Sequence, residues 1–298
     1  MTQLRDPING DSASVFAEKI GLPPEYLAAA EPIALRLLAE RSDDIARLID
    51  DPKARSAENV HAAAEGIEKD PDLGMLAVGL ILCMDAHRLY SGRGIDDGIY
   101  YASVRELTVW AKTCERETGH IGFYEWGWLT NFLTASIVRL GRLEFHRVPF
   151  RDGEPYEKRG VTAKPGDTVI NIHVPEDGPL DPDAVREAFI CAYRYFGCAG
   201  TAVFVCESWL LWPGNYEFLP ESSRIRAFMD LFEIIDREDR KNSGDLWRVF
   251  GRRKSYDPAS LPRNTALRRA MADYLAAHDS VTGYGYGVAL FDGTDFVR

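Results

Sequence analysis

The sequence is short of positive charge. It contains 35 lysine and arginine residues against 46 aspartate and glutamate residues, which gives a net charge of -11 at pH 7. Proteins that hold nucleic acid through its phosphates need a basic surface, so this balance argues against a nucleic-acid partner. An acidic surface instead tolerates small cationic or amine-bearing partners.

Cysteine is also scarce, and the five cysteines are scattered over positions 83, 114, 191, 198 and 206. They form no CxxC pair and no cysteine–histidine spacing that is typical of a metal-binding motif. The sequence therefore predicts free thiols in a reducing compartment and no metal. Cys83 and His87 of "CMDAH" lie one helical turn apart, but on a strongly apolar segment where packing is the simpler interpretation.

Long apolar runs and familiar catalytic motifs are missing as well. The N-terminal residues MTQLRDPINGDS include no apolar leader, and the apolar stretch from Leu76 to Met84 is short for a bilayer span. We therefore expect a cytoplasmic protein without a membrane partner. There is no P-loop, HExxH or GxSxG motif, and "GYGYG" at residues 283–287 is not followed by the helix that a dinucleotide fingerprint requires.

What is present indicates two domains. A hydrophobic content of 46% supports a large core. Up to about Leu140, apolar residues recur at spacings of three and four, which predicts a helical domain over residues 1–140. From Gly141 onward, alternation in "RLEFHRV" and "DTVINIHVP" predicts strands, so residues 141–298 form a domain of the α+β (mixed α/β) class.

The second domain is predicted to continue with a helix that Asp181 caps and Pro182 begins, followed by a buried strand at "TAVFVC". Further strands are predicted at "FMDLFEII" and "LWRVF", then a helix at "NTALRRAMADYLAAH" and a strand in "GYGYGVALF". The order strand, strand, helix, strand thus occurs twice. Either an internal duplication or chance explains this repeat.

A basic segment precedes the second of these helices. A helix N-terminus attracts anions through its unpaired N–H groups and its dipole, so a phosphorylated ligand is one interpretation of this segment. A solvated basic face without a ligand is the other. The candidate anion-binding residues are Arg252, Arg253, Lys254, Arg263, Asn264 and Thr265.

Two further places carry candidate chemistry. His173 lies on the polar face of its predicted strand, where a neutral imidazole can accept a proton, although a structural histidine is the alternative. Glu207 and Ser208 lie where a strand gives way to a helix, although Ser208 equally fits a helix cap. Cys206 and Trp209 in the same stretch are better interpreted as core residues.

Several of these segments resemble a known family. The helical half contains "RGIDDGIY" and the closing "RLGRLEF", and it resembles the N-terminal N-acyltransferase domain of bacterial acyltransferase-domain proteins. The second half resembles their GNAT-like C-terminal domain through "HVPEDGPLDPDAV", "CESWLLWP", "FLPESSRI" and "LPRNTALRRA". The resemblance implies a helical N-terminal domain followed by a GNAT-like mixed sheet that is flanked by helices.

The resemblance also implies a reaction. Acyl-CoA would be the co-substrate, and its acyl group would pass to a small-molecule amine, or another nucleophile, by direct attack on the thioester. The alternative is a catalytically silent GNAT-like module that binds a ligand or a protein.

In the enzyme, His173 or Glu207 would be the base, directly or through water, and Ser208 would assist the leaving thiolate or orient the substrate. The basic segment would hold the pyrophosphate of coenzyme A. Candidate substrate contacts are Arg139, Arg142, Trp209 and Tyr216, although a salt bridge would explain the two arginines equally well.

The chain also departs from the family pattern. The usual GNAT pyrophosphate loop, Arg/Gln-x-x-Gly-x-Gly/Ala between a strand and a helix, is missing. Trp212 also stands where an aspartate is expected in relatives.

Overall fold

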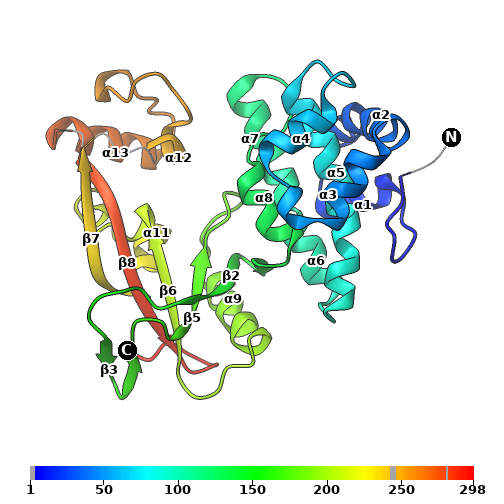
Figure 1. Ribbon diagram of the computed structural model, residues 1–298. Coiled ribbons are helices and arrows are strands. Elements are labelled where there is room, and N and C mark those ends of the chain that lie inside the picture. The colour runs from blue at the N-terminus through cyan, green and yellow to red at the C-terminus, as the bar shows by residue number, and fades with distance from the viewer. Residues whose placement is uncertain (1–3, 242–245, 280) are drawn as a thin grey trace. The chain divides into compact units, whose positions relative to one another are not determined.

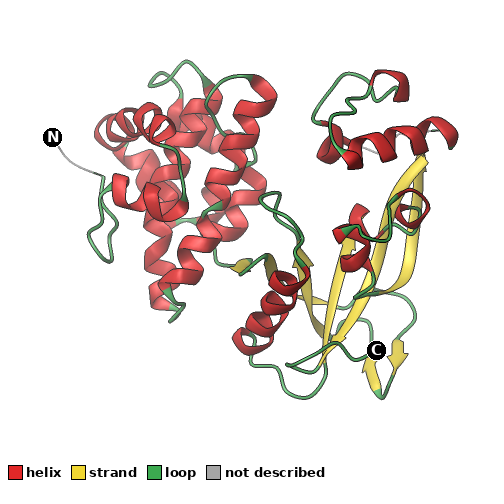
Figure 2. Cartoon of the chain, turned by 180° about the vertical axis from the view of Figure 1, so that it is seen from behind, coloured by secondary structure: helices red, strands yellow, loops and turns green. Residues whose placement is uncertain are grey.

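A computed structural model of the chain describes residues 4–241, 246–279 and 281–298. The chain divides into two compact units, Met1–Leu140 and Gly141–Arg298. The division falls where the spacing of apolar residues changes from helical to alternating. Figure 2 shows that the first unit is built of helices, whereas the second combines strands with helices.

The first unit is a helical assembly around α5 (Pro71–Gly92). Fourteen residues of this helix are buried, on all of its sides, as expected for a helix that neighbours surround. The other elements of the unit are α1 (Ala13–Ile20), α2 (Pro24–Glu40), α3 (Ser42–Asp50), η1 (Pro52–Ala54), α4 (Ala57–Ala64), α6 (Asp97–Val104), α7 (Glu106–Thr118), α8 (Trp126–Leu133) and β1 (Val138–Leu140).

By length and composition, α5 is able to cross a membrane, which the short run Leu76–Met84 did not indicate. It is the one helix among the described residues that meets this test. However, 78% of its most apolar window is buried inside the protein. A core helix passes the same test of composition, and the burial of α5 fits that explanation.

The second unit contains a mixed sheet, which confirms the α+β class. Its strands are β2 (Leu143–Pro149), β5 (Thr168–His173), β6 (Ala202–Ser208), β8 (Val281–Phe291) and β7 (Glu233–Lys241), in that spatial order. The pair β5–β6 is parallel, and the pairs β2–β5, β6–β8 and β7–β8 are antiparallel. The remaining elements are β3 (Tyr156–Lys158), β4 (Val161–Ala163), α9 (Pro182–Tyr195), η2 (Trp209–Leu211), α10 (Asn215–Phe218), α11 (Arg224–Met229), α12 (Leu246–Phe250), η3 (Pro258–Ser260) and α13 (Ala266–Ala277).

The two faces of this sheet have different cores. On one face, Phe189 of α9 packs against Phe204 of β6 and Phe291 of β8. As predicted, Asp181 caps α9, and its carboxylate accepts hydrogen bonds from the N–H groups of residues 183 and 184. On the other face, Val205 and Val288 belong to a cluster that the β3–β4 hairpin helps to cover. Helices α12 and α13 lie at the end of the sheet where β8 begins (Figure 1).

Two strand predictions in this unit are wrong. "LWRVF" forms α12, because its buried residues Leu246, Val249 and Phe250 follow helical spacing rather than alternation. In "FMDLFEII" the first residues complete α11, and the strand begins only at Glu233. Among the described residues, only one strand, β7, therefore stands directly before α12 and α13, and the order strand, strand, helix, strand that suggested a duplication does not occur a second time.

Candidate functional site

The parallel ladder between β5 and β6 ends before the two strands do. It joins only Ile170 to Phe204 and Asn171 to Val205. Nevertheless β5 continues to His173, which pairs with Glu144 of β2, and β6 continues to Ser208, which pairs with β8. We call the carboxyl ends of the two strands, residues 172–173 and 206–208, where the ladder between them does not continue, the β5–β6 gap.

A cluster of polar side chains lies on one face beside this gap. Nε2 of His173 is 3.0 Å from Nδ2 of Asn171 and 3.1 Å from Nε2 of His146. The same Asn171 nitrogen is 3.0 Å from Nε2 of His146. The three residues come from neighbouring strands, and strand alternation directs all of them to the same side of the sheet.

Glu207 reaches the same face from the other side of the gap. It follows the paired residue Val205 by two positions, as His173 follows Asn171, so alternation places Glu207 and His173 on one side of the sheet. The Glu207 residue is exposed, and its partner across the β6–β8 ladder is Tyr286. The gap is therefore bordered by an imidazole on β5 and a carboxylate on β6.

The imidazole of His173 is held in its neutral form. Burial, together with the nearby His146 and the positive charge of Arg248, lowers the pKa of His173 to about 4. Burial also lowers the pKa of His146. At neutral pH both rings are uncharged, and a neutral imidazole can accept a proton.

Ser208 does not share this arrangement. It follows Glu207 directly, so its side chain points to the opposite face of the sheet. Its hydroxyl oxygen accepts a hydrogen bond of 3.1 Å from the N–H of Leu210 and caps η2. The capping interpretation of Ser208 therefore has a contact to support it, whereas the catalytic one has none.

Cys206 is an inert thiol here. The residue is buried, and burial raises its pKa to about 12, so the thiol stays protonated at neutral pH.

The start of α13 holds part of the basic segment. The side chain of Thr265 caps the helix by accepting from the N–H of Arg268, and Oδ1 of Asn264 accepts from Nη1 of the same arginine at 2.8 Å. Arg263 forms a salt bridge with Asp273 at 2.5 Å. These three candidates lie together, and these contacts join them to residues of α13.

The other basic residues lie beside α12. The guanidinium of Arg252 lies 4.7 Å from the centre of the Trp247 ring, and that of Arg248 lies 4.6 Å from it. Arg253 donates to the carbonyl of Ser260 at 3.4 Å, and Lys254 is exposed. Two arginines therefore flank one half-buried tryptophan, and one of them, Arg248, is the residue that also influences His173.

The candidate substrate contacts are placed as follows. Arg142 donates to the carbonyl groups of Pro175, Gly178 and Pro179, and so fastens the loop that follows His173. In the first unit, Arg139 is buried. Trp209 lines a small apolar hollow and packs against α12 and α13, and the hydroxyl of Tyr216 donates to Asp230 at 2.7 Å.

Sequence reasoning missed several residues of this site. Arg248 was assigned to a strand. Tyr286 belongs to "GYGYG", which was considered only as a dinucleotide motif. Glu144, which is fully buried and faces His173 across the β2–β5 ladder, was recognised only as one residue of an alternating strand. Alternation could have placed Glu144 and His146 on one face, but only the strand register brings them beside His173.

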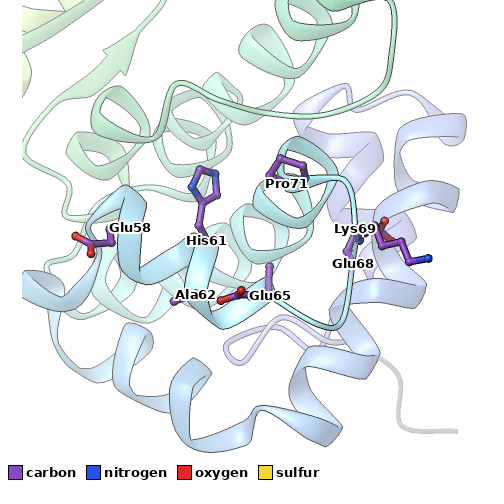
Figure 3. Close-up of a pocket in the computed structure, with 8 residues that line it drawn as sticks. Glu58, His61, Ala62, Glu65, Glu68, Lys69 and Pro71 are labelled. Carbon is purple, nitrogen blue, oxygen red and sulfur yellow. Dashed lines mark hydrogen bonds between the residues drawn. The ribbon is translucent and has the colours of Figure 1, made fainter.

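A second hollow lies on the first unit, and none of the residues predicted to bind or react lines it. Figure 3 shows its lining side chains, which include Glu58, His61 and Glu65, spread along the rim rather than directed at one point. Another lining residue, Glu68, accepts hydrogen bonds from the N–H groups of Lys69 and Asp70. This hollow therefore offers no catalytic arrangement.

Comparison with known protein families gives two matches. The model of the N-acyltransferase N-terminal domain matches residues 11–135, and that of the GNAT-like C-terminal domain matches residues 137–288. The chain belongs to the GNAT-like acyltransferase family. A comparison with curated protein sequences finds no match.

Solved structures share the fold of this chain. One is an acyltransferase in complex with decanoyl-CoA and teicoplanin, with a TM-score of 0.70 and 23% identity over 96% of this chain and 91% of the other. A second is an acyltransferase in complex with CoA and 10C-teicoplanin, with a TM-score of 0.70 and 23% identity over 96% and 88% of the two chains. This GNAT-like chain thus shares a fold with them over nearly its whole length.

Proposed function

We propose that the protein is an acyltransferase that moves an acyl group from coenzyme A to an amine by direct attack on the thioester. One observation carries the proposal: the ladder between β5 and β6 ends before the two strands do, with His173 and Glu207 on the same face of the two strands. Family membership supports the reaction class, and the solved relatives hold CoA or decanoyl-CoA.

In this proposal the amine nitrogen forms a bond to the carbonyl carbon of the thioester, and the carbon–sulfur bond then breaks. Before this attack, the ammonium form of the acceptor gives a proton to His173 or Glu207, directly or through water, because only the free amine has the lone pair that forms the bond. A backbone N–H at the β5–β6 gap stabilises the oxyanion, and the thiolate of coenzyme A leaves and takes up a proton. No acyl-cysteine is formed, since Cys206 is buried and protonated.

Charge around α12 supports the place of the coenzyme A phosphates. The loop that other GNAT proteins use is missing, and the helix after β5 begins with Asp181 and Asp183, which repel a phosphate. Arg248 and Arg252 beside Trp247 offer two positive charges and an aromatic face. We therefore place the phosphates near α12, with Arg253, Lys254 and the start of α13 behind them.

The proposed acceptor is defined by its chemical class, an amine. An amine-bearing molecule fits the acidic charge of the chain, and teicoplanin in one of the solved relatives makes a glycopeptide of that class the first acceptor to test. Cytoplasmic localisation stays a prediction.

Release of free thiol from acyl-CoA in the presence of an amine acceptor tests the proposed chemistry. His173→Ala and Glu207→Gln should each slow the release, by about 10²–10⁴-fold for the residue that acts as base. Ser208→Ala is the matched control from the same strand end, and should leave the rate within a fewfold of that of the unmodified protein. Unchanged rates in both His173→Ala and Glu207→Gln would remove both residues from the mechanism.

The alternative, a silent GNAT-like module, differs in one result. It would raise its unfolding midpoint when coenzyme A or an acyl-CoA binds, as any ligand does, but would release no thiol with any acceptor. The pair of solved relatives with teicoplanin and 10C-teicoplanin favours the enzyme over this alternative.

A further inference from the structure

Four residues with metal-binding side chains converge in the first unit, far along the sequence from the proposed acyl-transfer residues. A carboxylate oxygen of Asp72, Sγ of Cys114 and a ring nitrogen of His120 are candidate ligand atoms that lie within 4.8 Å of one another. Nε2 of His120 is 3.2 Å from Oδ2 of Asp72 and 3.6 Å from Oδ2 of Asp70. From these contacts we propose that Asp70, Asp72, Cys114 and His120 bind one zinc-like divalent cation.

The donor set and its spacing fit zinc. Zinc takes sulfur, nitrogen and oxygen ligands in a tetrahedron, at about 2.0–2.3 Å from the metal. Two such ligands are then about 3.3–3.8 Å apart, and the contacts of His120 with the two carboxylates fall near this range. The Cys114 thiol lies no more than 4.8 Å from the candidate atoms of Asp72 and His120, so a small side-chain movement is enough to bring it to the metal.

The backbone around the cluster is already fixed. Oδ1 of Asp70 caps α5 by accepting from the N–H groups of Asp72 and Leu73, which leaves its Oδ2 directed at His120. The N–H of Phe123 donates to the carbonyl of Asp72 at 2.9 Å. A side chain at Gly122 would place its Cβ 2.5 Å from that of Asp72, so only glycine lets the loop come this close. The loop that carries His120 is thus packed directly onto the start of α5.

A metal ion would also suit the surroundings of Cys114. The residue is fully buried and lies close to the carboxylate of Asp72. A bound dication would favour the thiolate and screen the two carboxylates from each other. Metal binding would then release the thiol proton to solvent and join the ends of α5 and α7 with the loop after α7.

All four residues lie in the helical unit, and none of them is among the residues proposed for acyl transfer. The sequence predicted no metal, since positions 70, 72, 114 and 120 match no short metal-binding motif. The two carboxylates, the thiol and the imidazole meet only after α5 and α7 have packed together.

Cobalt substitution tests the proposal on the full chain after treatment with a chelator. Titration with CoCl₂ should produce visible bands of a tetrahedral site and a near-ultraviolet thiolate charge-transfer band, both saturating at one ion per chain. Zn²⁺ should displace the cobalt and raise the unfolding midpoint. In Cys114→Ser the charge-transfer band should vanish, whereas Cys191→Ser, at a half-buried cysteine of α9, should keep it.

Two milder variants keep the test valid if Cys114→Ser fails to fold. The side chains of His120 and Asp72 are partly exposed, at 44% and 26%, so His120→Asn and Asp72→Asn should preserve the helices. Each should weaken Co²⁺ affinity by about tenfold or more. The proposal is overturned if the unmodified protein gives no cobalt bands, if the thiolate band survives Cys114→Ser, or if His120→Asn and Asp72→Asn bind Co²⁺ as tightly as the unmodified chain.

Discussion

His173 combines burial with two neighbours that disfavour its charged form. Its imidazole lies 3.1 Å from that of His146, and the positive charge of Arg248 adds to the effect of burial. The folded protein therefore resists protonation at this position, whereas the unfolded chain takes up a proton near pH 6.5. A group of this kind makes folding depend on pH.

The first prediction concerns this dependence. Because the pKa of His173 is lower in the folded state, its contribution to stability is complete above about pH 6.5 and is lost as the pH falls toward 4. Between pH 7 and pH 5 the free energy of unfolding should fall by about 2 kcal/mol through this residue. Urea unfolding at the two pH values measures this decrease. In His173→Gln the free energy of unfolding should fall by about 2 kcal/mol less than in the unmodified protein. His61→Gln, at an exposed residue of α4, should behave as the unmodified protein; an equal loss in all three would contradict the account.

Arg248 offers a second prediction at the same scale. Its charge contributes to lowering the pKa of His173, so Arg248→Gln should raise that pKa toward its ordinary value of 6.5. An NMR titration of the histidine rings measures the change directly. Arg237→Gln, on the exposed strand β7, removes an equal charge and is the control. If the two variants leave the His173 titration identical, α12 does not act on the site.

Among the elements, β8 contains the "GYGYG" stretch, and close packing explains its glycines without a dinucleotide site. A Cβ at Gly283 would lie 2.0 Å from the carbonyl oxygen of Glu238, and one at Gly285 would lie 2.1 Å from that of Leu211. At Gly287 it would lie 2.8 Å from Cβ of Phe232. The three glycines let β7 and the segment after β6 pack directly on the backbone of β8.

This packing gives a third prediction. Gly285→Ala should lower the free energy of unfolding by about 1–3 kcal/mol or more, because the backbone of η2 cannot move away without disturbing the end of β6. Gly127→Ala, in helix α8, is the control, since a Cβ there would meet no atom within 4 Å. It should be neutral or slightly stabilising, by up to about 1 kcal/mol. Chemical denaturation of both variants decides the point, and a neutral Gly285→Ala would show that η2 is not pressed against β8.

Elements that begin with a capping residue or have a long regular apolar pattern could be predicted from the sequence. Short elements without such features could not. Asp181 and Pro182 marked the start of α9 correctly, because capping depends only on adjacent residues. The five residues of "LWRVF" were misassigned, because a short apolar run fits a strand and a helical turn equally well. The hairpin β3–β4 was missed, since each strand has only three residues and little apolar content.

At the scale of the whole molecule, the change of apolar spacing at Gly141 coincides with the structural division between Leu140 and Gly141. Each unit buries its own core, so the spacing of apolar residues in each follows its own secondary structure. The boundary is therefore visible in the sequence even when the contacts of the fold are not known. Family membership and fold class were likewise within reach of the sequence. The arrangement of the site was not, because it depends on the register of β2, β5 and β6.

His173 and Glu207 illustrate this limit. Each was predicted from its local context, and the order of the strands places them on one face beside the β5–β6 gap. Ser208 had the same local context as Glu207, but alternation turned it to the other face, where it caps η2. Arg142 was proposed as a substrate contact, and the fold uses it to fasten the loop after β5.

The proposed reaction of this chain is the transfer of an acyl group from coenzyme A to an amine. It is tested by mass spectrometry of an amine acceptor after incubation with the protein and acetyl-CoA or a longer acyl-CoA, with the released thiol quantified in parallel. One acyl mass should be added per thiol released, at a rate well above that without protein. Binding of acyl-CoA with no acylated product above the protein-free rate, for any acceptor tested, would contradict the proposal.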